Sequence, residues 1–179
     1  MKNKTLLILL MFAPFLLIAQ TDEITMPDIP LDEEGNIRYT EVVKEDAKSK
    51  DLFYRCVSWI NTEYENPNSV TRKRDMVNGR IEILHQFRVY NTLESGTRTS
   101  AGLVYYTLTI RFKDGRYRAE MTDFIIKRQV RTPANIWLDE SKIDYSPNYA
   151  TQLDEFAKIK LKSLKKGMLP AKVYQEEEW

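Results

Sequence analysis

The chain has 179 residues, 42% of them apolar, and its 27 basic and 26 acidic residues nearly cancel. This balance excludes a general polyanion-binding protein, while the length and apolar content suit one domain with its own core. The single cysteine, Cys56, excludes an internal disulfide, and its apolar neighbours predict a packed thiol rather than a nucleophile.

Residues 1–19 predict a secretory signal peptide. Lys2 and Lys4 precede the apolar run 6–18, and Ala19 stands just before the first acids; this order is typical of cleaved leaders. A retained membrane anchor is the alternative, but the run is shorter than the roughly 20 residues that span a bilayer. We therefore expect an exported protein of the periplasm or cell envelope, with no transmembrane segment after cleavage.

Charge divides the rest of the chain. Residues 22–34 carry six acids and no base, and the prolines nearby predict an extended acidic lead-in over 20–37. Residues 38–131 carry 18 basic and 12 acidic residues. We expect a single domain over 38–168 and a tail over 169–179.

The first half of that domain predicts a strand, a helix and a hairpin. Residues 38–45 alternate as a strand does, whereas residues 50–64 place apolar side chains at helical spacing, with Ser49 as the N-cap. Asn78-Gly79 predicts a hairpin whose second arm carries Ile81, Ile83, His85, Phe87 and Val89 on one face. The composition of residues 91–102 is typical of a mobile loop.

Residues 105–124 predict a second hairpin with its register. A type I′ turn at Asp114-Gly115 places Leu108 opposite Met121 and Ile110 opposite Ala119 on an apolar face. The same register sets Asp123 opposite Tyr106. The other face pairs polar residues: Arg111 with Arg118, Thr109 with Glu120, and Thr107 with Thr122.

The C-terminal part is less regular. Residues 125–147 show no clear period, and a last helix follows with Leu153, Ala157, Leu161 and Leu164 at helical spacing and Gly167 as an αL stop. The elements together predict an α+β fold, β-α-β-β-β-β-α. Its five-stranded antiparallel sheet carries two helices on one face and leaves the other face in water.

Two segments resemble a known family. "IPLDEEGNIRYTEVVKEDAKSKDLFYRCVSWI" (29–60) and "GLVYYTLTIRFKDGRYRAEMTDF" (102–124) are similar to members of the family catalogued as domain of unknown function 4468. The shared features are a "G-x-x-x-Y-x-x-V-V" entry strand and a "Y-T-L-T-I-x-x-K-D-G-R-Y-R" hairpin that ends in "D-F". The resemblance implies an exported protein of a Gram-negative bacterium with a TATA-binding-protein-like (TBP-like) fold. It implies no function and no catalytic residues.

No catalytic set is evident in the sequence. The only histidine, His85, falls in a core-facing register, and no acid or cysteine lies at metal-ligand spacing near it. A hydrolase that uses His85 with Asp123 is the enzymatic alternative, and it requires the two side chains to meet within about 3 Å or through one water. We therefore expect a non-enzymatic protein without metal or cofactor.

The polar face of the predicted sheet is the favoured binding surface. It would contact an envelope protein, an envelope glycan or another acidic ligand, alone or with the 91–102 loop, and an envelope assembly role is the alternative. Nucleic acid is not expected, because an exported chain meets little DNA and this face lacks apolar wedges. The candidate residues are Arg88, Thr107, Thr109, Arg111, Arg118, Glu120 and Thr122.

Overall fold

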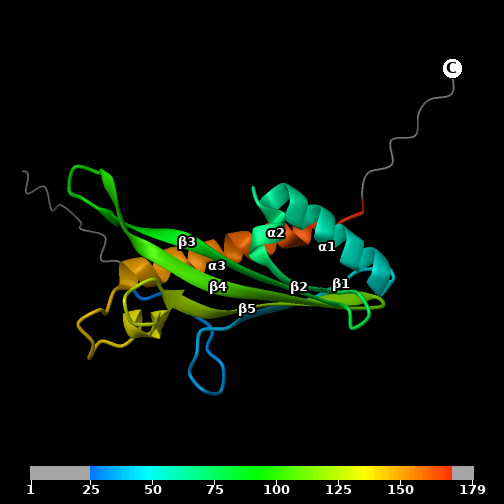
Figure 1. The fold of residues 1–179 in the computed structure, drawn as a ribbon. Helices are drawn as coiled ribbons and strands as arrows, with labels where there is room; N and C mark the ends of the chain where they lie inside the picture. Colours follow the sequence, from blue (N-terminus) through cyan, green and yellow to red (C-terminus); the bar gives the residue numbers. More distant parts are fainter. Residues whose placement is uncertain (1–24, 171–179) are drawn as a thin grey trace, which may run out of the picture.

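The computed structural model describes residues 25–170, so the predicted leader at 1–19 and most of the predicted tail lie outside the described residues. The chain forms one antiparallel sheet with its helices on one side of it (Figure 1). The elements in chain order are β1 (Tyr39–Lys44), α1 (Ser49–Glu63), α2 (Pro67–Val70), β2 (Thr71–Asp75), β3 (Arg80–Thr92), β4 (Arg98–Lys113), β5 (Arg116–Ile126), β6 (Thr132–Pro133), the 3-10 turn η1 (Ala134–Trp137) and α3 (Pro147–Gly167).

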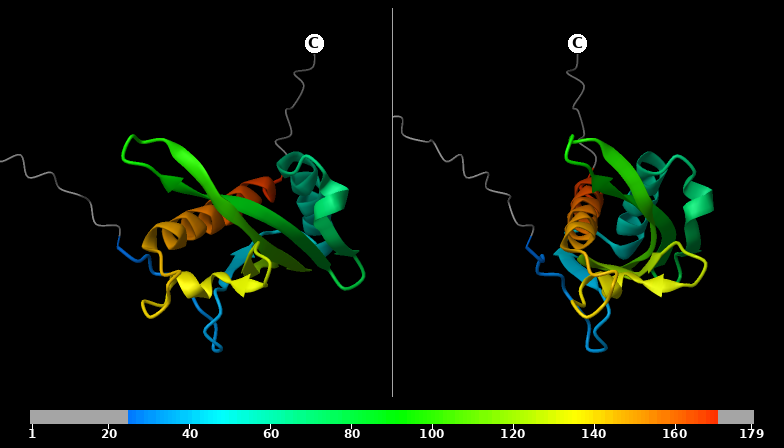
Figure 2. Two further views of the ribbon diagram at one scale, coloured as in Figure 1. Left: turned by 60° about the vertical axis from the view of Figure 1, so that its left-hand side comes forward. Right: turned by 90° about the vertical axis from the view of Figure 1, so that its left-hand side faces the viewer.

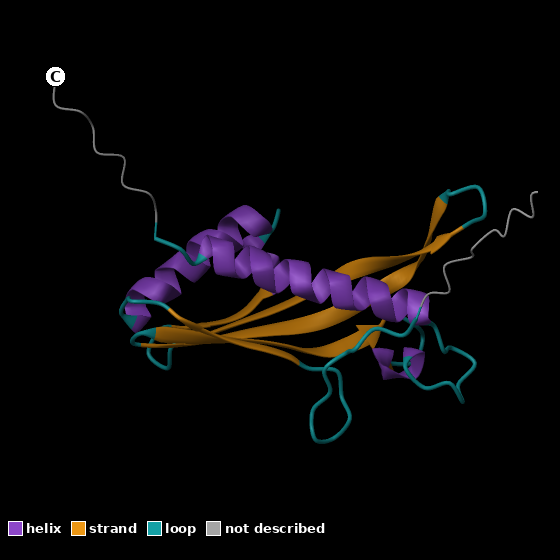
Figure 3. Cartoon of the chain, turned by 180° about the vertical axis from the view of Figure 1, so that it is seen from behind, coloured by secondary structure: helices purple, strands orange, loops and turns teal. Residues whose placement is uncertain are grey.

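The strand order is β1-β5-β4-β3-β2, and α1 and α3 lie together on one face of the sheet (Figure 3). The predicted TBP-like α+β architecture is confirmed, with one addition. The short β6 pairs with the last residues of β5, Ile125 and Ile126. These lie beyond Met121, the last β5 residue that pairs with β1. The segment 125–147 therefore contributes a strand and η1 that the sequence did not predict.

The core lies between the helices and the inward face of the sheet. Leu108 and Ile110 of β4 are fully buried, as are Ile81 and Ile83 of β3, so the predicted apolar face is confirmed. Cys56 is also fully buried in α1. Burial raises the pKa of its thiol far above the ordinary value, so Cys56 is a core residue as predicted.

At two helix ends the predicted role of the terminal residue is wrong. Ser49 does not cap α1; it is the first helical residue, and its N–H donates to the Asp114 carboxylate at 2.8 Å. Gly167 does not take the left-handed conformation of an αL stop. Glycine is required at this position because a Cβ would lie 2.3 Å from Cδ1 of Trp59. The absence of a side chain allows α3 to approach α1.

The hairpins also differ from prediction in detail. Gly115 has a positive φ of 78°, but Asp123 is the only non-glycine residue within 25–170 that does, so Asp114-Gly115 does not form a type I′ turn. Its predicted register is nevertheless confirmed from Lys113–Arg116 to Thr107–Thr122.

The expected loop at 91–102 is largely strand. β3 and β4 remain paired out to Thr92 and Arg98, and the chain turns only over 93–97. The resulting arm twists out beyond the rest of the sheet (Figure 2). Near its base the Gln152 side chain of α3 accepts from the Tyr90 N–H and donates to the Tyr90 carbonyl, both at 2.9 Å, and so takes the place of a neighbouring strand.

None of the helices within residues 25–170 is both long enough and apolar enough to cross a membrane.

Candidate functional site

The face of the sheet that the helices leave uncovered, the open face, carries all seven predicted binding residues. Strand alternation puts them there, because their neighbours Leu108, Ile110 and Ala119 point into the core. Thr107 lies opposite Thr122, Thr109 opposite Glu120 and Arg111 opposite Arg118. Arg88 lies on the same face but at a distance, because it pairs with Leu103 near the arm, where its guanidinium donates to Ser100 at 2.6 Å.

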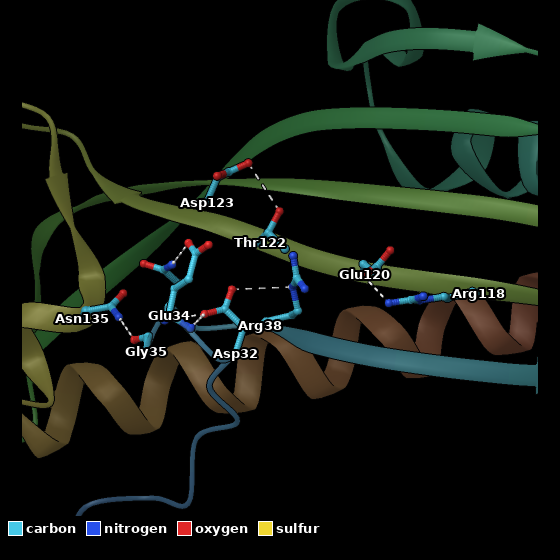
Figure 4. A network of polar contacts seen from close by, with 10 residues as sticks. Asp32, Glu34, Gly35, Arg38, Arg118, Glu120, Thr122, Asp123 and Asn135 are labelled. Atoms are coloured by element: carbon cyan, nitrogen blue, oxygen red, sulfur yellow. Dashed lines mark hydrogen bonds and ion pairs between the residues drawn. The ribbon is translucent and has the colours of Figure 1, made fainter.

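Arginines form a row across the open face. Arg80, Arg111 and Arg118 face one another on β3, β4 and β5, and Val42 of β1 completes the row. Two of these arginines have acidic partners two residues along their own strands. Arg118 contacts Glu120 at 2.7 Å, and Arg80 pairs with Glu82 (Figure 4 shows the first pair). No ion pair of Arg111 occurs within the described part of the chain.

A hollow opens around this row at the β4–β5 turn. Its volume is about 340 Å³, and the side chains that surround it are Val42, Arg111, Lys113, Arg116, Tyr117 and Arg118. We call it the basic hollow, because four of the six are bases and none is an acid. Val42, on the edge strand β1, is 57% exposed. Lys44, which lies opposite Arg116 on β1, adds a base beside it.

Lys113, Arg116 and Val42 were missed by the sequence prediction. The first two lie opposite each other one step beyond the predicted Arg111–Arg118 pair, so the alternation of the hairpin could have found them. Val42 could not be found, because the pairing of β1 with β5 joins segments far apart in the sequence.

At the other end of the sheet a groove runs from the side of α1 and α2, where His85 lines it, to Tyr105 and Thr107 on the open face. Two adjoining cavities of about 560 and 620 Å³ share Arg72, Leu84, Tyr105 and Lys127. The Lys127 ammonium lies 5.9 Å from the centroid of the Tyr105 ring. The sequence prediction did not include this groove, although Tyr105 stands on the polar face of the predicted hairpin.

The structure separates the two residues of the hydrolase alternative. His85 is on the packed face, where its ring lies 5.1 Å from that of Tyr64 and 6.2 Å from that of Tyr106. Asp123 is exposed and lines a cavity on the open face with Thr107. They point to opposite faces of the sheet, and β4 separates their strands β3 and β5, so they do not form a catalytic pair.

A β-bulge explains why the predicted register fails at Asp123. Thr107 pairs with Thr122 and Tyr105 with Ile125, so that Asp123 and Phe124 together face Tyr106. Asp123 takes a φ of 54° and turns outward, where the Thr122 hydroxyl donates to it at 3.3 Å (Figure 4). Phe124 takes the buried place, and the Tyr106 hydroxyl forms a hydrogen bond with that of Tyr64 at 3.2 Å.

No group of three or more histidine, cysteine, aspartate or glutamate side chains within residues 25–170 could hold a metal ion. Burial, with a smaller contribution from Lys160, lowers the pKa of His85 below 6.5, so its imidazole is neutral at pH 7. The open face itself offers charge, hydrogen bonding and an aromatic surface, through its arginines, its threonines and Tyr105.

Comparisons with known proteins agree with this architecture. A family model described as "Domain of unknown function (DUF4468) with TBP-like fold" matches residues 39–127. A DUF4468 family protein from Bacteroides ovatus has a similar crystal structure, with a TM-score of 0.65 at 13% identity over 82% of this chain and 94% of that one. A TBP-like protein from Parabacteroides distasonis gives 0.64 at 13% identity over 80% and 99%. No curated protein matches the sequence. The chain belongs to the DUF4468 family, whose TBP-like domain it carries at residues 39–127.

Proposed function

We propose that this chain is an exported binding module and that its basic hollow takes an anionic ligand. The observation that carries the proposal is the gathering of Arg111, Lys113, Arg116 and Arg118 around one hollow that no acid lines. Only Arg118 of the four has an ion-pair partner within residues 25–170. Clustered bases with low-dielectric surroundings focus a positive potential and attract anions.

The shape of the hollow favours an extended ligand. It spans β4, β5 and the edge strand β1, where the Val42 side chain is exposed, so a ligand can lie across three strands. An acidic oligosaccharide or an acidic protein segment can lie across such a surface. Export, which rests on the leader at residues 1–19, would place the hollow where envelope glycans and proteins occur.

Charge reversal tests the proposal with a sulfated oligosaccharide as the probe. Arg111→Glu/Arg116→Glu should weaken its binding about tenfold or more at low ionic strength, because each reversal replaces an attraction by a repulsion. The matched control is Lys50→Glu/Lys162→Glu, which makes the same change of charge at exposed positions on α1 and α3. The control should bind as the wild type does. Equal loss in both variants, or binding of a neutral oligosaccharide with the same affinity, would refute a specific anion site.

A further inference from the structure

An acidic loop on the same face is complementary to the basic hollow. Residues 31–37, which we call the acidic loop, carry Asp32, Glu33 and Glu34. The loop projects from the side of the sheet opposite to α1 and α3 (Figure 1, blue). Leu31, at its base, is 51% exposed, as Val42 of the hollow is at 57%.

The acidic loop is built as a fixed element. Leu31 and Ile37 form a β-bridge, and the Asp32 carboxylate accepts from the N–H of Glu34 at 3.1 Å and of Asn36 at 2.8 Å. From η1, the Asn135 side chain donates to the Gly35 carbonyl (Figure 4). Glu33 and Glu34 are exposed, and neither forms an ion pair within the described residues.

The loop does not reach the hollow of its own chain. It lies beside Thr122–Ile125 of β5, with which Asp32 and Glu34 line a common cavity, whereas the hollow lies at Arg116 and Arg118. Thr122, the nearest β5 residue of that cavity, lies four residues along the strand from Arg118, or about 13 Å at 3.3 Å per residue. The contacts that fix the loop hold it at that distance.

We propose that the basic hollow binds the acidic loop of a second copy of this chain, in a two-fold dimer whose open faces lie against each other. Loop and hollow lie on one face, so a two-fold axis between them brings both loops onto both hollows at once. Such an interface is closed and self-complementary. Glu33 and Glu34 then face Arg111 and Arg116, and Leu31 contacts Val42. The inference rests on the proposed function and names a partner for the same hollow, for which an external anion would compete.

Charge-swap complementation tests the dimer. Wild type should self-associate in sedimentation equilibrium at low ionic strength, and rising salt should dissociate it, because the contacts are exposed ion pairs. Glu33→Lys/Glu34→Lys and Arg111→Glu/Arg116→Glu should each raise the dissociation constant about tenfold or more. An equimolar mixture of the two should associate again, because each loop then meets a hollow of opposite charge.

Three outcomes would overturn the inference: a monomeric wild type at low ionic strength, no association in the mixture, or growth beyond a dimer as concentration rises. The last result would indicate a head-to-tail chain rather than a two-fold pair. A failure of the dimer is told apart from a failure of anion binding by measuring whether Glu33→Lys/Glu34→Lys binds the sulfated oligosaccharide. If the variant binds the probe but no dimer forms, only the self-association is wrong.

Discussion

Gly167 of α3 lies against the indole of Trp59 in α1, so closely that a Cβ on the glycine would be 2.3 Å from Cδ1 and 2.7 Å from Cγ of the tryptophan. This contact sets how near the end of α3 approaches α1. The same tryptophan donates from its ring N–H to the Ser163 hydroxyl at 3.1 Å, so it cannot rotate away without loss of a hydrogen bond. The two helices are therefore joined by a close fit at the end of α3.

Gly167→Ala should destabilise the protein by about 1–3 kcal/mol, the usual cost of overpacking a core. This loss should occur although alanine favours a helix by about 1 kcal/mol over glycine. Urea unfolding measures it. In a Trp59→Leu background the obstacle is smaller, and Gly167→Ala should then be neutral or stabilising. Destabilisation of the same size in both backgrounds would contradict the contact.

Asp123 should tolerate glycine better than valine. With a φ of 54°, the backbone at the bulge is in a region that glycine adopts freely and β-branched residues avoid. We expect Asp123→Gly to raise the free energy of unfolding by up to about 1 kcal/mol and Asp123→Val to lower it by at least about 1 kcal/mol. The two variants showing equal stability by denaturant unfolding would argue against the left-handed conformation.

His85 should make the fold less stable in mild acid. Its folded pKa lies below the ordinary 6.5, because burial and the nearby Lys160 disfavour the charged form. The unfolded chain then binds more protons between these two pKa values, so this contribution to stability is complete above pH 6.5 and is lost as the pH falls below it.

The His85 prediction is simple to check, because the chain has a single histidine. An NMR titration of its ring carbons should give a pKa below 6.5, and His85→Gln should reduce the loss of stability between about pH 7 and pH 5. A ring that titrates at or above 6.5 would mean that the imidazole is solvated rather than packed against Tyr64 and Tyr106.

Gln152 should protect the β3 edge at the base of the twisted arm. Its amide makes two hydrogen bonds to the Tyr90 backbone, so Gln152→Ala should cost about 1–2 kcal/mol. Hydrogen exchange at the Tyr90 amide should become faster, whereas the amide of Ile83, which lies within the paired region of β2 and β3, should keep its protection. Unchanged exchange at Tyr90 would mean that the side chain does not substitute for a strand.

Local pattern predicts much of this fold. Alternation and the position of the Asp114-Gly115 loop were sufficient for the register from Thr107–Thr122 to Lys113–Arg116, although the loop is not the predicted type I′ turn. The basic residues Arg111 and Arg118 followed from that register. The bulge at Asp123 did not, since no rule of alternation signals an inserted residue that depends on the packing of Phe124.

Contacts between segments far apart in the chain could not be predicted from the sequence. The N-terminus of α1 is satisfied by Asp114 from a turn 65 residues later in the chain. The place of Val42 in the basic hollow likewise depends on the pairing of β1 with β5. The composition of residues 91–102 predicts a loop, but its threonines are β-formers, and the Gln152 side chain of α3 supplies hydrogen bonds at Tyr90 that a neighbouring strand would otherwise make.

The most direct test of anion binding at the basic hollow is a titration of ¹⁵N-labelled protein with the sulfated oligosaccharide at low ionic strength. Amide shifts should change on β1 at Val42 and along the β4–β5 turn from Arg111 to Arg118, and they should return as salt is added. Shifts confined to α1 and α3 would contradict the account. So would a sulfated oligosaccharide that causes no more shifts than a neutral one.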